Sequence, residues 1–442
     1  MATNLWLEQF QQCSETAQDP NRLAELLTID INDPQVSSLQ NDILDNSIDV
    51  SAKVESVNLH DGDWPGLVGL AQAYLRLCES VDPNDLAGSF DLYVDVFTNV
   101  QTAFANTRGA VLGVALSRCS RTMLALSLSL DSQLSPTEMI RTSYIASILL
   151  KMFNSIRGEK IDPSMMDGSV PTKKDHILFV ATLLCRAYFK LGKPSSCANV
   201  FSNIHTANIK FSRYALSQRV EYRYYLGRYY VFKNQFGNAY RHLQWAFDRC
   251  LSSSKNKRLI LIYLIPVALI LGKLPTMPLL EQYGLESTYS PLVNALKSAN
   301  YQQFMAHVDS QPYRDWFLRR GLHVALRTRT IVVLHRQILS KVWRLTGQKT
   351  VIKFDHVRKA LVLSMGSHED AVLMLDNDPD NEKLEAIFVS LISQGYLKAK
   401  VFSRNRVLRL PPQGAIPLMV DVHKIAGPEG LVLTGHEKWM DQ

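Results

Sequence analysis

The sequence predicts a mainly α-helical protein, in which a solenoid of tetratricopeptide-like helical repeats is capped by a C-terminal winged-helix domain. From Leu67 to about Leu345, apolar residues recur at helical spacing, with turn residues between the periods and no β-rich stretch. After Gly347 the pattern changes to strand, helix, helix and hairpin, which is the element order of a winged helix. The chain has 442 residues, 46% of them hydrophobic and 20% charged, and is long enough for several packed units.

Residues 1–66 are predicted to form an acidic, partly irregular N-terminal segment. Residues 1–100 hold 3 Lys/Arg and 17 Asp/Glu, whereas residues 101–310 hold 25 and 11, and residues 311–410 hold 18 and 9. The net charge of +7 is therefore the sum of an acidic head, residues 1–100, and a basic body, residues 101–410, with a small contribution from the tail. A basic body suits a polyanionic partner, either nucleic acid or an acidic protein.

The helical-repeat domain is expected over residues 67–336. Two of its hairpins share a register in which small residues let antiparallel helices touch. The shared positions are Leu184, Cys185, Tyr188, Cys197, Phe201 and Ile204 in the first hairpin, and Leu226, Gly227, Tyr230, Ala239, Leu243 and Ala246 in the second. Stacking such hairpins buries a continuous core, which favours a solenoid.

The winged-helix domain is expected over residues 337–410, followed by an irregular tail over residues 411–442. Its elements are a strand at 350–354, a helix at 355–365, a helix at 382–394, and strands at 396–402 and 406–410. The acidic loop at 376–380 lacks the ligand spacing of a calcium site, so we interpret it as a solvated loop that caps the next helix.

The chain carries no catalytic motif. It lacks the phosphate-binding GxxxxGK[ST], the dinucleotide-binding GxGxxG, the nucleophile-elbow GxSxG and the zinc-binding HExxH. Its 11 histidines are scattered, and its six cysteines occur singly, as expected for reduced, buried thiols of an intracellular protein. We therefore expect no enzyme, no cofactor, no metal site and no small-molecule substrate.

No segment is expected to span a membrane. The longest apolar stretch without a charge, Leu259 to Gly272, has 14 residues. A transmembrane helix needs about 20. We expect this stretch to border a groove that another chain completes, so that the isolated protein is poorly soluble.

Three segments resemble the PCI-domain family. They are the hairpin YYLGRYYVFKNQFGNAYRHLQWAFDRC, the following KNKRLILIYLIP at 255–266, and LISQGYLKAKV at 391–401. The chain is most similar to the branch that holds the PCI subunit of the TREX-2 mRNA-export complex and the fungal protein called signalosome subunit twelve. The resemblance extends over about 175–410 and is weak before residue 100.

The resemblance implies a non-catalytic scaffold subunit of a nuclear, TREX-2-like mRNA-export complex. The partners that it implies are a larger PCI-like scaffold protein, a small acidic disordered protein shared with the proteasome lid, and RNA or DNA on a composite basic surface. The implied location is the nucleus, including the nuclear pore, with some of the protein in the cytoplasm. Two alternatives stay open: a subunit of a related PCI assembly tied to the signalosome or to splicing-coupled transcription, and a free-standing nucleic-acid-binding regulator.

Nucleic acid is expected to contact basic residues that lead into the winged helix or lie on its hairpin: Lys341, Arg344, Lys349, Lys353, Lys398, Lys400, Arg404 and Arg406. Lys398 and Lys400 are two residues apart, so they would share one face of a strand. The third helix carries only Lys383, opposed by Glu382 and Glu385, and is a poor reader of the major groove. The alternative is that these charges form an ordinary solubilising surface.

Protein partners are expected at two further places. Lys255, Lys257 and Arg258 lie in a segment that resembles the family and suit an acidic partner. Leu384, Phe388 and Leu391 lie on one face of the third helix and are expected to dock the larger scaffold chain.

Overall fold

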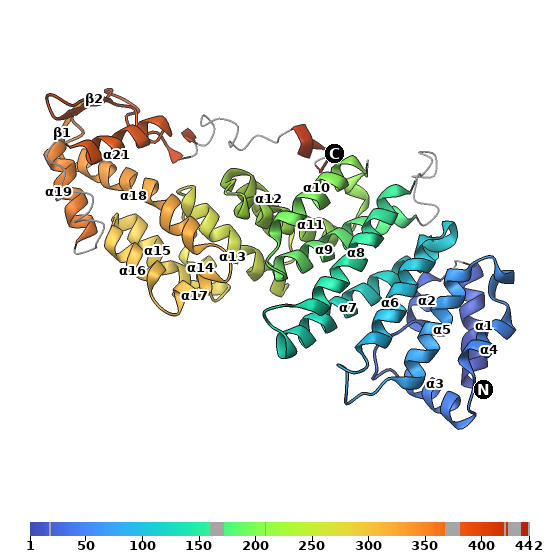
Figure 1. Cartoon of the computed structure of the whole chain (residues 1–442). Helices are drawn as coiled ribbons and strands as arrows, with labels where there is room; N and C mark the ends of the chain where they lie inside the picture. The colour runs from blue at the N-terminus through green and yellow to red at the C-terminus, as the bar shows by residue number, and fades with distance from the viewer. Residues whose placement is uncertain are drawn as a thin grey trace. The chain divides into compact units, whose positions relative to one another are not determined.

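The structure is a computed structural model that describes residues 1–16, 19–159, 172–207, 209–366, 381–419, 421–422 and 435–440. The chain divides into two compact units, residues 1–225 with 439–442 and residues 226–438. The boundary between them lies within the helix α11 (Leu216–Phe232). Both units are built almost wholly of helices, so the predicted fold class is confirmed (Figure 1).

The first unit consists of helices that pack on their sequence neighbours, most extensively α5 on α6 and α8 on α9. Its helices before α11 are α1 (Ala2–Thr16), α2 (Pro20–Leu26), α3 (Pro34–Asp45), α4 (Val50–Val57), α5 (Pro65–Ser80), α6 (Phe90–Ala105), α7 (Gly113–Leu134), α8 (Ile140–Gly158), α9 (Ile177–Lys190) and α10 (Cys197–Thr206).

The segment over residues 1–66 is more regular than its composition suggests, because α1 to α4 occupy most of it. Some of the acidic residues of this segment are N-caps of helices. The side chains of Asp19, Asp33 and Asp49 accept hydrogen bonds from backbone N–H groups in the first turns of α2, α3 and α4. Negative charge at a helix N-terminus is also stabilised by the helix dipole. These aspartates therefore start helices, although their polarity is also typical of loops.

Aromatic residues tie the acidic head to the core of the first unit. Trp6 stacks on Phe10 and Tyr74, with ring centroids 4.9 and 5.1 Å apart. Its indole Nε1 donates a hydrogen bond to the Leu26 carbonyl at 2.9 Å, so the buried ring leaves no polar group unsatisfied. One stretch of this unit, residues 107–134, is long and apolar enough to cross a membrane, and 56% of its most apolar 18-residue portion is buried inside the protein.

The second unit begins within α11 and contains the remaining helices and all strands of the described chain. Its elements are α12 (Phe236–Arg249), α13 (Lys255–Ile270), α14 (Met277–Gln282), α15 (Glu286–Ser298), α16 (Tyr301–Asp309), α17 (Tyr313–Leu318), α18 (His323–Leu345), β1 (Val351–Lys353), α19 (Phe354–Met365), α21 (Glu382–Ser393), β2 (Lys400–Phe402) and β3 (Val407–Arg409).

The second predicted hairpin is formed by the end of α11 and by α12. Ala239, Leu243 and Ala246 are fully buried, and a Cβ atom at Gly227 would lie only 2.7 Å from Cγ of Leu243. The first register is found in α9 and α10, where Cys185, Cys197 and Ile204 are likewise buried. A small residue at the crossing therefore sets how closely the two helices approach.

The apolar run from Leu259 to Gly272 forms most of α13, and most of its side chains are buried in the core of the second unit. Every residue from Ile260 to Val267 is buried. Within this run the expected groove that another chain completes is therefore not found, because α13 packs on α12 and α18 instead.

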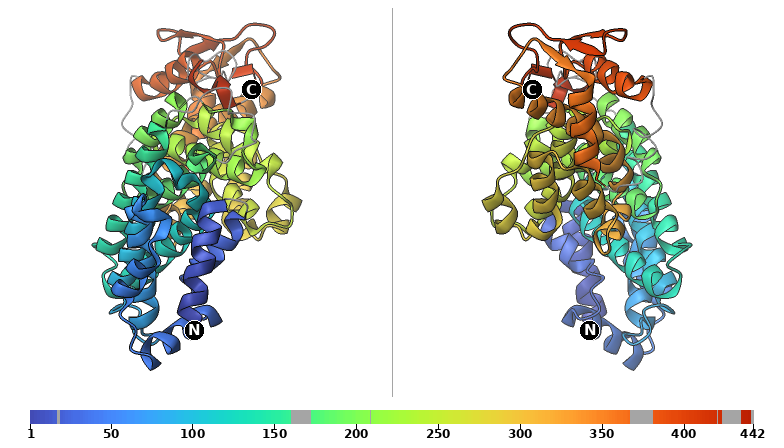
Figure 2. Two further views of the ribbon diagram at one scale, coloured as in Figure 1. Left: turned by 90° about the vertical axis from the view of Figure 1, so that its right-hand side faces the viewer. Right: turned by 90° about the vertical axis from the view of Figure 1, so that its left-hand side faces the viewer.

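The C-terminal part of the second unit has the predicted order of strand, helix, helix and hairpin. The three strands form one antiparallel sheet in the order β1, β3, β2, and Figure 2 shows them beside α21. The boundary expected at residue 337 is wrong, because α18 runs without interruption through it. This helix packs on α13 and α16 as well as on α19 and α21, so the repeats and the winged helix share it.

Leu384, Phe388 and Leu391 are not available to a partner, which corrects the prediction that they dock a scaffold chain. Their exposed fractions are 0%, 0% and 1%, and the Phe388 ring packs on Phe354 at a centroid distance of 5.2 Å. A domain with one three-stranded sheet has so little interior that this face of α21 supplies much of it. The neighbouring Val389 is 57% exposed.

The tail is only partly irregular. Residues 411–418 form no helix or strand, and the Ala415 carbonyl accepts a hydrogen bond from the Lys398 N–H at 2.8 Å. Residues 435–440, however, form the short 3-10 helix η9 (Gly435–Met440), in which Glu437 and Met440 are buried. The prediction of an irregular tail is therefore wrong for this segment.

Close packing at Gly227 predicts a steric cost for any side chain. Gly227→Ala should lower the free energy of unfolding by about 1–3 kcal/mol, because Leu243 must shift. Gly158→Ala is the matched control, since a Cβ atom at this last residue of α8 has no neighbour within 4 Å. Urea denaturation of both variants measures the difference, and an equal response of the two variants would contradict the packing described above.

Phe388→Ala should lower the free energy of unfolding by about 3–5 kcal/mol, because it leaves a cavity where a fully buried ring was. Val389→Ala, at the exposed next position, should change it by less than about 0.5 kcal/mol. Thermal denaturation followed by circular dichroism compares the two. A Phe388→Ala protein as stable as the Val389→Ala protein would show that α21 is not part of the core.

The buried histidine of α18 predicts a loss of stability in acid. Nε2 of His335 has no hydrogen-bond partner among the described residues, and burial lowers the pKa of this side chain from 6.5 to about 4. Because the pKa is lower in the folded than in the unfolded state, the neutral ring contributes stability that is complete above about 6.5 and is lost as the pH falls towards 4.

His335→Leu should therefore reduce the loss of unfolding free energy between pH 7 and pH 5 by about 2 kcal/mol. The same substitution at His356, an exposed histidine of α19, is the matched control. Urea denaturation at the two pH values measures both. A pH dependence that is identical in the wild-type and His335→Leu proteins would exclude this contribution.

Candidate functional site

Six side chains form the outer face of the three-stranded sheet, which we call the wing face. They are Val351 and Lys353 of β1, Lys400 and Phe402 of β2, and Val407 and Arg409 of β3. The register pairs Arg409 with both Val351 and Lys400, and pairs Val407 with both Lys353 and Phe402. Paired residues and residues two apart lie on the same side of a sheet, so these six share one face.

The inner face of the sheet explains why the wing face points outward. Ile352 and Leu408 are 1% and 0% exposed and pair with each other across β1 and β3. A slip of one residue would move these side chains into solvent, so their burial specifies the register. The central strand thereby presents Arg409 outward, between the two edge strands.

The wing face combines exposed cations with exposed apolar side chains. Lys353, Lys400 and Arg409 are all exposed, and Phe402 and Val351 are 40% and 47% exposed. An exposed aromatic ring offers a surface on which a base can stack, while nearby Lys and Arg side chains can neutralise phosphates. The arrangement is therefore chemically suited to a nucleic-acid strand.

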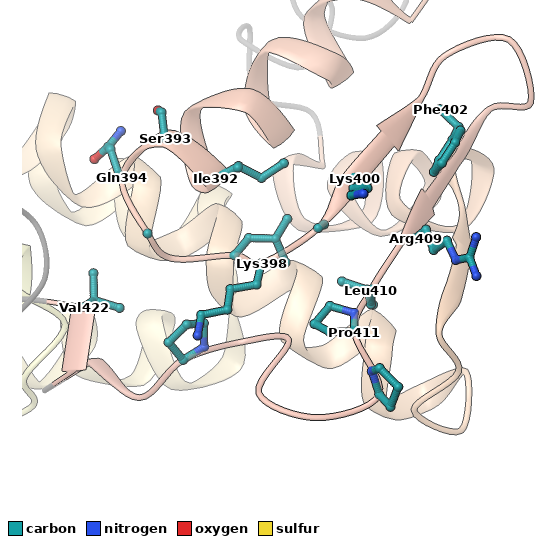
Figure 3. A pocket seen from close by; sticks show the side chains of 15 residues that line it. Ile392, Ser393, Gln394, Lys398, Lys400, Phe402, Arg409, Leu410, Pro411 and Val422 are labelled. Carbon is teal, nitrogen blue, oxygen red and sulfur yellow. The ribbon is translucent and has the colours of Figure 1, made fainter.

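A hollow of about 1010 Å³ adjoins the wing face between α21, the hairpin and the tail. Figure 3 shows Ile392 at the end of α21, Lys398 before the hairpin, and Lys400, Phe402 and Arg409 on its strands around this hollow. A second hollow of about 540 Å³ lies between the end of α18 and β1, where Lys349, Lys353 and His356 line it. Cations and apolar groups thus line two concave surfaces next to the sheet.

The predicted nucleic-acid-binding residues of the hairpin are exposed. Lys398 and Lys400, Arg404 in the turn, and Arg406 at its end all face solvent. The expectation that Lys398 and Lys400 share one face of a strand is wrong, because β2 begins at Lys400 and the Lys398 N–H bonds the tail instead. Both side chains nevertheless line the hollow shown in Figure 3.

The predicted basic residues of α18 donate hydrogen bonds to backbone carbonyls of helices. The Lys341 ammonium donates a hydrogen bond to the Ser298 carbonyl at the end of α15, at 2.6 Å. A cation at a helix C-terminus is favourable, because it meets carbonyls that have no partner within the helix. Arg344 is exposed, and its Nε donates to the Ser340 carbonyl of its own helix at 3.3 Å.

Two of the three cations near the start of α13 also donate hydrogen bonds to backbone carbonyls. The Lys257 ammonium donates to the Cys250 carbonyl at 3.1 Å and lies 4.7 Å from the centre of the Phe247 ring. The Arg258 guanidinium donates from Nε to the Tyr283 carbonyl at 2.9 Å. Lys255 is exposed at the first turn. The positive charge at this place therefore partly serves the ends of neighbouring helices.

Arg409 and Phe402 were missed as site residues by sequence reasoning. Both lie in the predicted hairpin, and the alternation of residues 396–402 and 406–410 was a signal that each belongs to one face of a strand. Only the pairing of Lys400 with Arg409 shows that their cations lie on one face of the sheet.

The described residues contain no group of three or more His, Cys, Asp or Glu side chains that could hold a metal ion. All six cysteines are free thiols, and Cys78, Cys119, Cys185 and Cys197 are buried. Burial raises the pKa of the Cys119 thiol to about 12, which keeps it protonated and unreactive at neutral pH. The acidic loop at 376–380 lies outside the described residues.

Comparison with known proteins shows several relatives, although no family model matches the chain. A PCI domain-containing protein of Schizosaccharomyces pombe is 29% identical over 419 residues, which are 92% of each chain. The nuclear mRNA export protein THP1 of Saccharomyces cerevisiae is 26% identical over 367 residues, which are 75% of this chain and 78% of that one. PCI domain-containing protein 2 of Xenopus laevis is 29% identical over 248 residues, 56% of this chain and 58% of that one.

The first of these alignments covers nearly the whole of both chains, and the winged helix that follows helical repeats agrees with the resemblance drawn from the sequence. Together these findings show that this chain is similar to PCI-domain proteins over nearly its whole length.

Proposed function

We propose that this chain is a non-catalytic scaffold subunit of a nuclear, TREX-2-like mRNA-export complex. The relative that carries mRNA export in its name aligns with 75% of the chain, which supports this role. The observation that carries most weight is the wing face, because an exposed sheet with three cations around an aromatic ring is suited to a nucleic acid. The proposed location is the nucleus, including the nuclear pore, with some of the protein in the cytoplasm.

The proposed protein partners are a larger PCI-like scaffold chain and a small acidic protein. For the scaffold chain, the exposed apolar side chains of the winged helix replace the buried face of α21 as contacts. Leu363 on α19 is 84% exposed and Val389 on α21 is 57% exposed. For the acidic protein, the exposed Lys255 and the basic residues of the chain supply complementary charge.

The proposed nucleic-acid contact is made with the backbone rather than with base edges. The third helix of the winged helix carries Glu382 and Glu385 beside Lys383, and the Glu385 carboxylate accepts a hydrogen bond from Ser403 at 2.8 Å. An acidic recognition helix is unfavourable in a groove flanked by phosphates. We therefore expect RNA or DNA to follow the sheet and hairpin, where the cations are exposed.

Affinity purification of the tagged protein from its native cells, followed by mass spectrometry, tests the proposed assembly. We expect a larger PCI-like chain and a small acidic chain to copurify with mRNA-export factors. Recovery of signalosome subunits in their place would support the related PCI assembly instead. A protein that copurifies with no other chain would overturn the scaffold proposal and favour a free-standing regulator.

Reversing the charge of the wing face should weaken nucleic-acid binding evenly across sequences. We expect the variant Lys353→Glu, Lys400→Glu, Arg409→Glu in the assembled complex to bind several RNA and DNA sequences more weakly by a similar factor. The log–log dependence of affinity on salt should flatten by about 0.7–0.9 for each lost phosphate contact. Fluorescence anisotropy at three or more salt concentrations measures both quantities.

The matched control reverses three exposed cations outside the winged helix, Lys297, Arg314 and Arg329, and changes the net charge by the same amount. This control should retain most of the affinity, while both variants should still assemble with their protein partners. If the two variants lose the same affinity, the effect is one of overall charge. If only one sequence loses affinity, base readout rather than backbone contact is responsible.

A further inference from the structure

The end of the chain is held by a buried carboxylate. In the second unit, the side chain of Glu437 is 7% exposed and lies among Tyr230, Arg241 and His242. The Tyr230 hydroxyl and the Arg241 guanidinium donate hydrogen bonds to it, and His242 Nε2 lies 3.1 Å from the carboxylate. The His242 side chain is fully buried and that of Arg241 is 16% exposed. One carboxylate is therefore met by three polar side chains in a largely closed site.

The side chains around Glu437 favour the charged form of its carboxylate. Burial alone would raise the pKa of Glu437, but the hydrogen bonds and charges of His242, Tyr230 and Arg241 lower it below the ordinary value. A buried cation is costly without a negative partner. Since Arg241 Nε and Nη1 have no hydrogen-bond partner among the described residues, Glu437 supplies the anion that this guanidinium meets.

The residues after Glu437 are also bound. In the first unit, the Trp439 ring meets the rings of Phe211 and Tyr222 edge-on, with centroids 5.3 and 6.2 Å apart. The Arg223 side chain is 1% exposed and donates a hydrogen bond to the Met440 carbonyl at 3.1 Å. These contacts recognise an aromatic side chain and a backbone carbonyl, which are features of a docked peptide.

We propose that the segment with Glu437 is a peptide ligand carried by the chain itself, and that Tyr230, Arg241 and His242 form, within the second unit, a site for the carboxylate of an acidic peptide. The ligand class is a short peptide that presents a glutamate side chain. While the C-terminal segment is bound, the site is closed to any other peptide of this class. This inference is independent of the proposed role in mRNA export.

A peptide-binding experiment with the full-length chain tests the proposal. The probe is a fluorescent peptide of residues 433–442, and the proteins are the wild type and the variant Glu437→Gln, Trp439→Ala, whose own segment should no longer dock. We expect the variant to bind the peptide saturably and at least tenfold more tightly than the wild type, whose site is occupied. Fluorescence anisotropy measures the affinity, and circular dichroism verifies that the variant is folded.

Two controls separate recognition from nonspecific attraction. The peptide with Glu437→Gln, and the protein variant with Arg241→Gln added, should each lose at least tenfold in affinity. A scrambled peptide of the same composition should not bind. Equal binding by wild-type and variant proteins, or no binding by a folded variant, would overturn the proposal. Binding that is unaffected by Arg241→Gln would show that the carboxylate site is not what recognises the peptide.

Discussion

The burial of α18 on two sides is the constraint on which the second unit depends. Leu334, Ile338 and Leu339 of this helix are at most 3% exposed, and the helix packs on α13, α15, α16 and α17 as well as on α19 and α21. Each such side chain stabilises the fold by about 1.5–3 kcal/mol relative to an exposed one. Because α18 packs on both the helical repeats and the winged helix, separating these two parts at residue 337 would expose the apolar face of α18. The wing sheet is therefore held by the same helix that closes the repeats.

The basic residues of this chain have two different tasks. Lys257, Arg258 and Lys341 donate hydrogen bonds to backbone carbonyls near the ends of helices, so they stabilise the helical repeats. The cations of the wing face and of the hairpin turn are exposed, and no helix end engages them among the contacts described above. The sheet and the hairpin turn therefore present positive charge that an external polyanion can meet, in a chain whose basic residues are spread over most of the sequence after residue 100.

The acidic residues are divided in a similar way. Asp19, Asp33 and Asp49 cap helices of the head, where their carboxylates meet backbone N–H groups. Glu437 is instead buried against side chains that are distant in sequence. A carboxylate near a helix start can be satisfied by local backbone, so its role follows from its neighbours in the chain. A carboxylate satisfied by residues about 200 positions away depends on the whole fold.

The sequence by itself determined the fold class, the paired helices with their small residues at the crossing, and the order of elements in the winged helix. These features follow from apolar spacing and turn residues within about 10–20 positions, which local periodicity records. The head is more regular than its composition suggests, and the irregular tail was predicted wrongly at residues 435–440, because capping aspartates and a short docked segment resemble loops. Only the tertiary structure decided that Phe388 is interior, that Arg409 lies beside Lys400, and that Glu437 reaches Arg241. Each of these depends on which distant residues meet, and that is settled by burial and pairing across the whole unit rather than by any local pattern.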